Sequence, residues 1–415
     1  MLHLQRALVL LEQNNYKEAE KELMRTLAEE PKHPLALRLL AMIYIDTGRP
    51  EEGVEAAQDA LEADPSDGEA HYVLAYGLMR QHKDAEAEKR VQEAIRLNPH
   101  ASHYFALWSA TAMHRKQYKR AVELANQALA LNAENMQALN LRATAQRYLG
   151  DNAGAEETIY RALEREPENS HSHANLGWSM LDQGKPKNAL EHFREALRHN
   201  PQSQYAKSGL VEALKARYWV YRIFLAYYLW MEKQSGRIQF LVIFGVLFVN
   251  RIINRAMDTY PEAKPVLMPL FVLVVAFAFS TWVISPLFNL MLLVNPYGRF
   301  ALSKEERFSA KLTGISLGTG LTAGALFLWV FPHGGFFALA FYGLFMMIPI
   351  AVLSWSREEK RLRWLTALAA VLAGIGAMAV LISFSVNAAF NWFSGAFIIG
   401  LLAFQLVTNF VAIRR

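Results

Sequence analysis

The chain has 415 residues, of which 53% are hydrophobic and 20% charged, and its formal net charge is +5. It has no cysteine, which excludes disulfides, thiolate catalysis and cysteine-ligated metals. Residues 1–237 carry 30 basic and 32 acidic side chains, whereas residues 238–415 carry 13 and 6. The basic excess therefore flanks the apolar segments of the second half, and we expect no nucleic-acid partner.

The first 201 residues repeat with a period of 34. Prolines and alanines each keep this spacing, at Pro31, Pro65, Pro99, Pro167 and Pro201 and at Ala60, Ala94, Ala128, Ala162 and Ala196. Ala133 occupies the one skipped proline position. Each repeat carries two helical patterns, and proline cannot continue the second helix at the chain reversal. A unit this short cannot bury its apolar face alone, so the pattern predicts six repeats stacked in an all-α solenoid.

Small residues mark the positions where the paired helices must approach and where the chain must turn. Ala41, Ala75, Ala143 and Gly177 recur on the first helices, and Ala19, Ala87, Ala121, Ala155 and Ala189 on the second. Gly48, Gly150 and Gly184 fall between the two helices, where we expect a positive φ.

These features resemble the tetratricopeptide repeat (TPR) family over residues 1–215. Repeat six matches the family pattern best, through Leu176, Gly177, Gly184, Ala189, Phe193, Ala196 and Pro201. Three departures occur: no repeat has the early tryptophan, Ala133 replaces a proline, and Gly53 stands where the second helix usually has alanine. The resemblance implies six repeats followed by a capping helix.

In TPR proteins the first helices line a concave groove, so the resemblance implies that first-helix residues would contact a protein or peptide. The expected groove residues are Arg38, Met42, Tyr72, Tyr76, Met79, His103, Met113, His114, Asn140, Arg147, Tyr148 and Trp178. Aromatic and methionine side chains dominate binding hot spots and adaptable grooves. The alternative is that these side chains pack on one another or on the second half of the chain.

Two more specific types of site are disfavoured in this half. A receptor for a C-terminal carboxylate would need an asparagine in the groove after Arg38. The groove positions that follow hold Met42 and then Val73 instead. Eleven of the twelve histidines lie here, but no carboxylate or thiol completes a ligand set at suitable spacing. We therefore expect no metal and no cofactor.

Residues 202–237 connect the repeats to the apolar half. Leu210, Leu214, Tyr221, Phe224, Tyr228 and Met231 are spaced by threes, fours and one seven, which predicts one helix of about thirty residues. We expect Trp219, Tyr227, Tyr228 and Trp230 to lie at the membrane-water interface on the cytoplasmic side, because large rings with a polar edge favour that boundary. An aromatic contact between this cap and the membrane bundle is the alternative.

Residues 238–415 form a predicted bundle of about six membrane-spanning helices, since each apolar segment approaches or exceeds the roughly 20 residues that cross a bilayer. The segments are 238–256, 265–294, 312–331, 336–355, 364–384 and 390–412. We expect the second segment to span to about Ile284 and then to kink near Pro286. Gly314, Gly318, Gly320 and Gly324 place the third segment at the centre of the bundle or at a dimer seam, so a homo-oligomer remains open.

The loop charges predict the orientation of these segments. Lys and Arg gather on the side of the repeats, at Arg217, Arg222, Lys233, Arg237, Arg299, Lys304, Arg307, Lys311, Arg357, Lys360, Arg361, Arg363, Arg414 and Arg415. The positive-inside rule then places the repeats and both termini in the cytoplasm, with a multi-pass bundle in a plasma or inner membrane. No signal peptide is expected either, because acidic residues directly follow the short apolar run from Ala7 to Leu11.

The membrane half lacks recognisable catalytic patterns. No charged residue lies in the middle of a span, and neither a zinc-protease HExxH motif nor a GxSxG motif occurs. We therefore predict that the chain is not an enzyme. The weakest hypothesis is an enzyme acting on a lipid-linked glycan, or a peptidase, with Arg251, Asn254, Arg255 and Asp258 near the outer face.

The sequence thus predicts a membrane-anchored cytoplasmic TPR scaffold that recruits or assembles a protein partner, with membrane lipids around its bundle. Its expected domains are 1–201, 202–237 and 238–415. The alternative is a transport or channel bundle for a lipid or apolar solute, regulated by the repeats, because broken helices often line transport sites.

Overall fold

The structure is a computed structural model, and it describes residues 2–353 and 359–413. Within these ranges every regular element is a helix, which confirms the predicted all-α class. The chain forms two compact units. The first unit contains residues 1–183 and 191–206, and the second contains residues 184–190 and 207–415.

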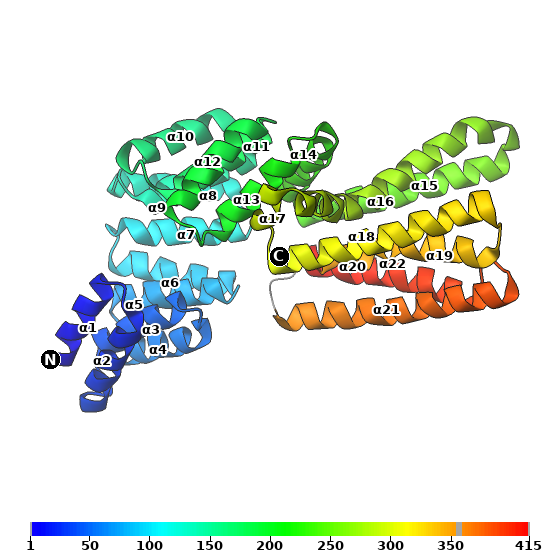
Figure 1. The fold of residues 1–415 in the computed structure, drawn as a ribbon. Helices are drawn as coiled ribbons and strands as arrows, with labels where there is room; N and C mark the ends of the chain where they lie inside the picture. The colour runs from blue at the N-terminus through cyan, green and yellow to red at the C-terminus, as the bar shows by residue number, and fades with distance from the viewer. Residues whose placement is uncertain (1, 354–358, 414–415) are drawn as a thin grey trace. The chain divides into compact units, whose positions relative to one another are not determined.

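Six consecutive helix pairs follow one another from the N-terminus, as the 34-residue period predicts (Figure 1). The pairs are α1 (Leu2–Glu12) with α2 (Tyr16–Glu29), α3 (Pro34–Asp46) with α4 (Pro50–Ala63), α5 (Gly68–Arg80) with α6 (Asp84–Leu97), α7 (Ser102–His114) with α8 (Tyr118–Leu131), α9 (Met136–Leu149) with α10 (Asn152–Arg165), and α11 (Ser170–Asp182) with α12 (Pro186–His199).

The second helix of each repeat ends two residues before the position at which proline recurs every 34 residues. Helix α4 ends at Ala63, and Asp64 is extended (φ −140°, ψ 93°) ahead of Pro65. Proline favours this conformation in the residue that precedes it. Asn132 is extended in the same way (φ −146°, ψ 101°) although Ala133 follows it. Stacking of the repeats therefore stops the helix even where proline is missing.

The turn inside each repeat contains one residue in the left-handed conformation. These residues lie 34 positions apart: Asn14 (φ 56°), Gly48 (84°), His82 (60°), Lys116 (57°), Gly150 (83°) and Gly184 (70°). The positive φ predicted for the three glycines is confirmed. The other three turns place a side chain in a conformation that costs about 1 kcal/mol or more outside glycine.

Close packing between helices explains one departure from the family pattern. A Cβ atom at Gly53 would lie 2.5 Å from Ile45 Cγ1 and 2.9 Å from the Ala41 carbonyl oxygen. Glycine therefore replaces the usual alanine because Ile45 fills the space. At Gly177 the equivalent Cβ would lie 2.8 Å from the Phe193 ring.

A turn divides the segment for which the sequence predicts one long helix, so that prediction is wrong. Helix α13 (Gln204–Lys215) and helix α14 (Trp219–Lys233) are separate, and Tyr218 between them is extended (φ −92°, ψ 126°). The turn lets Tyr221 reach back to α13, where its hydroxyl donates to Glu212 Oε2 at 2.6 Å.

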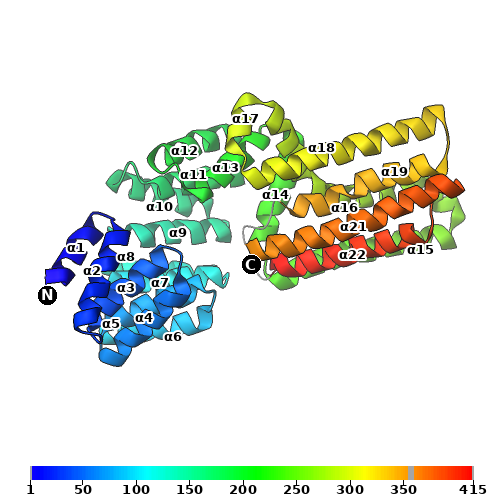
Figure 2. The same cartoon turned by 60° about the horizontal axis from the view of Figure 1, so that its bottom comes forward.

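The rest of the second unit contains long apolar helices and several short helical segments (Figure 2). They are α15 (Gly236–Thr259), η1 (Pro261–Ala263), α16 (Lys264–Val294), α17 (Pro296–Ala301), α18 (Lys304–Ala325), η2 (Leu326–Val330), α19 (Gly334–Phe345), α20 (Met347–Val352), α21 (Glu359–Val386) and α22 (Trp392–Ile413).

Five stretches of the described residues are long and apolar enough to cross a membrane: 236–259, 261–294, 304–330, 334–352 and 363–386. They coincide with the first five predicted segments. The sixth corresponds to α22, whose apolar part is recognised over Trp392–Gln405, and its crossing stays a prediction. The end of the fourth predicted segment, Arg357, Arg414 and Arg415 lie outside the described residues.

The predicted kink near Pro286 does not end the second membrane helix. Helix α16 runs through both Pro269 and Pro286 without interruption. Membrane helices tolerate proline because neighbouring groups satisfy the freed carbonyls.

The small residues of α18 pack inside the second unit. Ser309 Oγ donates to the Ile350 carbonyl at 2.8 Å, and Ser316 Oγ donates to the Gly343 carbonyl at 2.6 Å. A Cβ at Gly320 would meet Leu344 at 3.0 Å. Close backbone approach, not a dimer seam, therefore explains this glycine of the third segment.

Candidate protein-binding surface

The first helices of the repeats carry the residues that the sequence predicts for a binding groove. We call these twelve residues the first-helix surface. Nine of them are partly or fully exposed: Arg38, Met42, Tyr72, Tyr76, His103, Met113, His114, Tyr148 and Trp178. The other three are buried, with Met79 7%, Asn140 6% and Arg147 4% exposed. The prediction that these three contact a ligand directly is therefore corrected, because core packing encloses their side chains.

An aromatic cluster joins α5 and α7. The Tyr72 ring meets the His103 ring edge-on at 4.9 Å between centroids and stacks on Tyr104 at 5.5 Å. Glu69 organises the cluster, since its Oε1 lies 2.9 Å from His103 Nε2 and accepts a 2.9 Å hydrogen bond from the Tyr104 hydroxyl. One carboxylate oxygen thus fixes two rings, and the Tyr72 ring packs on both.

Burial and hydrogen bonding shift the pKa values in this cluster in opposite directions. Burial raises the pKa of Tyr72 to about 12, with the nearby Glu69 carboxylate adding to the rise. Burial, and then the hydrogen bond to Glu69, also raises the pKa of Tyr104. For Glu69 burial acts upward, but the hydrogen bonds from His103 and Tyr104 outweigh it and lower the pKa. Near neutral pH the cluster therefore holds two neutral phenols around one carboxylate.

Polar pairs connect neighbouring repeats along the same surface. Arg38 Nη1 lies 3.0 Å from Asp67 Oδ1. The Tyr76 hydroxyl donates to Asp46 Oδ1 at 3.2 Å. His114 Nδ1 lies 3.3 Å from Asp84 Oδ1. The partners are separated by 29 or 30 residues, so each pair holds one repeat to the next.

A buried ion pair fastens repeats five and six. Arg147 Nη1 lies 3.0 Å from Asp182 Oδ2, and each side chain is 4% exposed. The Arg147 guanidinium also lies 4.5 Å from the centre of the Tyr148 ring and 6.0 Å from that of Trp178. Trp178 lies against Tyr205, with 5.8 Å between ring centroids. A guanidinium enclosed by rings and a carboxylate is a structural element here.

Asn140 takes part in a second buried network. Its Oδ1 accepts from Ser172 Oγ at 3.1 Å and from Asn175 Nδ2 at 3.0 Å. The Tyr205 hydroxyl donates to Asn175 Oδ1 at 3.1 Å. This network explains why the polar Asn140 side chain lies in the interior, since buried polar groups require such partners.

Sequence reasoning missed the partners that hold the first-helix surface. Asp46, Glu69, Tyr104, Asn175 and Tyr205 were not among the predicted groove residues, yet each contacts one of them. A detectable signal existed, because acidic and amide residues recur 30 to 35 positions from a complementary donor. The alternative hypothesis of mutual packing thus describes part of the surface correctly.

The four residues expected at the membrane interface lie on helix α14 and form two groups, one exposed and one packed against α16. Trp219 and Trp230 are 67% and 45% exposed. Tyr227 packs edge-on against Phe277 of α16 at 5.6 Å, and the Tyr228 hydroxyl donates to the Thr281 carbonyl. Contact with α16 therefore accounts for the two tyrosines, while the two tryptophans are exposed and their place at a membrane interface stays a prediction.

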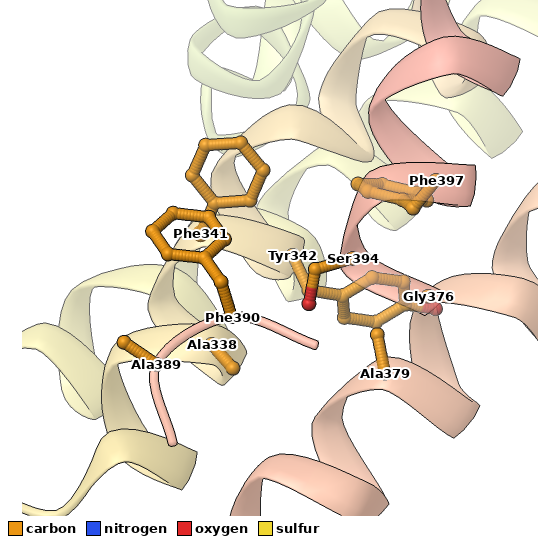
Figure 3. Close-up of a pocket in the computed structure, with 9 residues that line it drawn as sticks. All are labelled: Ala338, Phe341, Tyr342, Gly376, Ala379, Ala389, Phe390, Ser394 and Phe397. Carbon is orange, nitrogen blue, oxygen red and sulfur yellow. The ribbon is translucent and has the colours of Figure 1, made fainter. Parts of the chain in front are cut away.

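A small pocket in the second unit is formed by α19, α21, α22 and the turn before α22 (Figure 3). Phe341, Tyr342, Phe390 and Phe397 surround it, and Ser394 supplies a hydroxyl. The enclosed space has room for about one water molecule. A pocket of this size does not hold a lipid or a solute.

The helix pairs repeat with a period of 34 residues, and their first helices carry a surface rich in aromatic rings. These features define an α-solenoid of the protein-interaction class. A family model described as tetratricopeptide repeat matches residues 10–75, and a second model with the same description matches 111–171, 140–204 and 174–216. The N-terminal half of the chain therefore belongs to the tetratricopeptide repeat family.

Among known proteins, the chain is 26% identical over 177 residues to the human protein O-mannosyl-transferase TMTC1. This match covers 42% of the chain and 20% of that protein, so the chain spans a fifth of the relative's length. The activity in the relative's name belongs to that protein and is not transferred here.

Two of the following three similar solved structures, TTC0263 and YrrB, are described as TPR proteins. TTC0263 of Thermus thermophilus is 19% identical, with 44% of this chain and 98% of that chain covered and a TM-score of 0.41. PilF of Pseudomonas aeruginosa is 20% identical, with 50% and 94% covered and a TM-score of 0.42. YrrB, described as having an unusual peptide-binding site, is 18% identical, with 44% and 95% covered and a TM-score of 0.33.

Proposed function

We propose that this chain is a membrane-anchored scaffold whose TPR domain recruits or assembles a protein partner at the membrane. One observation carries the proposal: Tyr72, Tyr76 and His103 present partly exposed rings from neighbouring repeats. Tyr72 and Tyr76 are four residues apart and thus share one helix face. Rings held in place by fixed carboxylates lose little conformational freedom when a partner binds, and this favours affinity.

The chemistry of the surface favours one kind of partner segment. Tyr72, Tyr76 and Met42 offer apolar area, while Glu69 and Asp46 offer carboxylate oxygens beside it. An extended peptide or a helix with apolar side chains and a few hydrogen-bond donors would match this combination. Tyrosine and methionine are common in surfaces of this type.

The second unit would serve as the anchor. We propose six crossings, with the repeats, the cap of residues 202–237 and both termini on the cytoplasmic side of a plasma or inner membrane. The five long apolar stretches and the basic residues Lys304, Arg307 and Lys311 at the start of the third one support this arrangement. The exposed Trp219 and Trp230 support contact of α14 with the lipid headgroup region.

Photo-crosslinking in cells tests the recruitment. A photoreactive phenylalanine analogue would replace Tyr72, Tyr76 or Trp178 in the full chain, and mass spectrometry would identify the adducts. Tyr160 is the matched control, because it is an aromatic residue 49% exposed on the second helix of its repeat. We expect one recurrent protein adduct from Tyr72 and Tyr76 and none of it from Tyr160.

The result that contradicts the proposal is equally specific. Adducts confined to this chain at all three positions would show that its own residues fill the first-helix surface. The same protein adduct at Tyr160 would show a non-specific contact. In either case the scaffold function would be abandoned.

The small pocket between α19, α21 and α22 gives no support to the transport alternative. The pocket in Figure 3 has room for about one water molecule, and helix α16 continues through Pro286, near which a kink was expected. We therefore do not propose transport as a second function.

A further inference from the structure

Two oppositely charged surfaces lie two repeats apart in the first unit. We call residues 115–120, which end α7 and begin α8, the basic turn, because they contain four basic side chains and no acidic one. Helix α4 contains five acidic side chains and no basic one. All five are exposed, and we call them the acidic stripe: Glu51, Glu52, Glu55, Asp59 and Glu62. Repeat three, formed by α5 and α6, separates the two surfaces (Figure 1).

Contacts with α6 hold the arginines of the basic turn in place. Arg115 Nη1 and Arg120 Nη2 both contact the Glu88 carboxylate, at 2.5 and 2.6 Å. Trp108 Nε1 donates to the same carboxylate at 3.2 Å, and the Arg120 guanidinium lies 5.0 Å from the centre of the Trp108 ring. The Glu88 side chain is 14% exposed, whereas the two arginines are 38% and 40% exposed. Each guanidinium therefore keeps donors at the surface in a fixed position.

The neighbouring carboxylates do not neutralise the basic turn. Residues 83–90 and 115–123 contact each other through Glu88, and together they hold seven basic and four acidic side chains. The difference of seven and four leaves an excess of three positive charges. Lys116 and Lys119 of the turn are exposed. The surface therefore suits a partner that presents several carboxylates.

The acidic stripe is not explained by the needs of its own helix. Glu51, Glu55 and Asp59 are spaced by four residues, so they share one face and repel one another. Asp59 and Glu62 lie in the second half of α4, where the helix dipole disfavours negative charge. Arg49 lies 3.7 Å from Glu52, and the other four carboxylates form no ion pair in the described part of the chain.

Charge complementarity makes a second copy of this chain the partner that fits the basic turn. Helix α4 packs chiefly against α3 and α5, and α8 against α7 and α9. No ion pair joins the stripe to the turn among the described residues of one chain. The two surfaces can therefore meet only between copies. The proposed anchoring in one membrane would also concentrate the copies, which favours a contact of this kind.

We infer that copies of this chain associate through their TPR domains, with the acidic stripe of one copy against the basic turn of the next. The contact pairs two different surfaces, so it is heterologous, and its repetition builds a row or a closed ring. This inference goes beyond the scaffold function, because it assigns a partner to surfaces outside the first-helix surface.

Sedimentation velocity of the purified full chain in detergent measures the association. We expect oligomers at about 50 mM salt that dissociate at about 500 mM, because salt screens exposed charges. Glu55→Lys with Asp59→Lys should raise the dissociation constant at least about tenfold, and so should Lys116→Glu with Lys119→Glu. Glu157→Lys with Glu164→Lys is the matched control, since it makes the same change of charge at exposed positions of α10, and it should leave association unchanged.

A charge exchange distinguishes a lost contact from a folding defect. The chain that combines both reversals should associate again, because its stripe is then basic and its turn acidic. Failure of this chain to associate would overturn the inference, and so would a parent chain that stays monomeric at low salt. Phosphatidylglycerol adducts on a monomeric chain, removed by Lys116→Glu with Lys119→Glu in native mass spectrometry, would assign the basic turn to lipid instead.

Crosslinking between introduced cysteines tests which surfaces meet. The chain has no cysteine of its own, so Glu55→Cys and Lys119→Cys each supply a single thiol. The two variants would carry different tags and be mixed in vesicles with a short bismaleimide. We expect crosslinked pairs that contain both tags, and few pairs from either variant alone. Equal crosslinking in the mixture and in each variant alone would contradict the pairing of stripe with turn.

Discussion

The Lys215 ammonium lies 3.1 Å from Ser285 Oγ, which connects the end of α13 to the middle of α16. Its Nζ also lies 3.0 Å from Glu212 Oε1, and the side chain is only 1% exposed. The same carboxylate accepts the hydrogen bond from Tyr221. Burial, with Glu212 adding, raises the pKa of Tyr221 well above its usual value, so the phenol stays a donor. This cluster holds α13, α14 and α16 together.

We predict that Lys215→Met loosens α14 from α16. Removing one partner of a buried pair leaves an uncompensated charge and costs about 3 kcal/mol. Hydrogen–deuterium exchange in the full chain should therefore accelerate in residues 212–233. Lys207→Met on the same helix is the control and should not change exchange there. Unchanged exchange in Lys215→Met would show that the cluster is dispensable.

The left-handed turns allow a prediction with opposite signs at equivalent positions. Gly48→Ala forces a Cβ into φ 84° and should lower the free energy of unfolding of the repeats by about 1 kcal/mol. His82→Gly relieves the same strain at φ 60° and should raise it by about 0.5 kcal/mol. Urea unfolding followed by circular dichroism measures both. A shift in the same direction for both variants would contradict the argument.

Restoring the family's alanine at residue 53 should destabilise this protein. Gly53→Ala places a Cβ against Ile45 and the Ala41 carbonyl, and overpacking of this kind costs about 1–3 kcal/mol. Adding Ile45→Ala removes the side-chain part of the clash. The urea midpoint of the double variant should then lie above the value that the two single variants predict by addition.

Because the side chain of His71 is buried, we predict that the repeats become less stable in mild acid. Burial lowers its pKa, and its Nε2 lies 3.3 Å from the Pro65 carbonyl while Nδ1 has no partner among the described residues. The unfolded state therefore binds a proton more readily than the folded state below about pH 6.5. Stability is retained above that value and falls as the pH drops towards the lowered pKa. His71→Gln should flatten this dependence between pH 7 and 5 in urea titrations, whereas the exposed His100→Gln should not.

The absence of cysteine makes the membrane topology directly measurable. Ser303→Cys, Ser66→Cys and Pro332→Cys introduce single thiols at exposed positions before the third span, in the repeats and in the turn after that span. We expect an impermeant maleimide to label Pro332→Cys from the outside of intact cells. The other two should react only after the membrane is opened. Labelling of Ser303→Cys and Pro332→Cys from one side would rule out a crossing between them.

The repeats can be predicted from the sequence because the patterns that define them relate residues no more than 34 positions apart. The spacing of Pro65 and Pro99, the turn glycines and the buried alanines all describe contacts between helices adjacent in the chain. The same locality explains the mistake between α13 and α14. The seven-residue interval from Leu214 to Tyr221 continues the helical period across the turn, so the apolar pattern hides it.

The candidate surface was predicted only in part because its geometry depends on neighbouring repeats. Periodicity places Tyr72 and His103 on first helices, but it does not show that Glu69 binds His103 or that Asp182 encloses Arg147. A residue type that suits binding also suits packing between repeats. Met79 and Asn140 belong to the second group, and only the packed neighbours distinguish the two.

A partner recruited as proposed would act on the hydrogen bonds that join neighbouring repeats. A partner that takes the Tyr76 hydroxyl must release Asp46, and one that draws His103 away must release Glu69. Each such exchange loosens a joint between consecutive helix pairs, whereas a partner that bridges both groups stiffens it. A bound partner would therefore change how rigidly neighbouring helix pairs are held together, and the change would be separate at each pair of repeats.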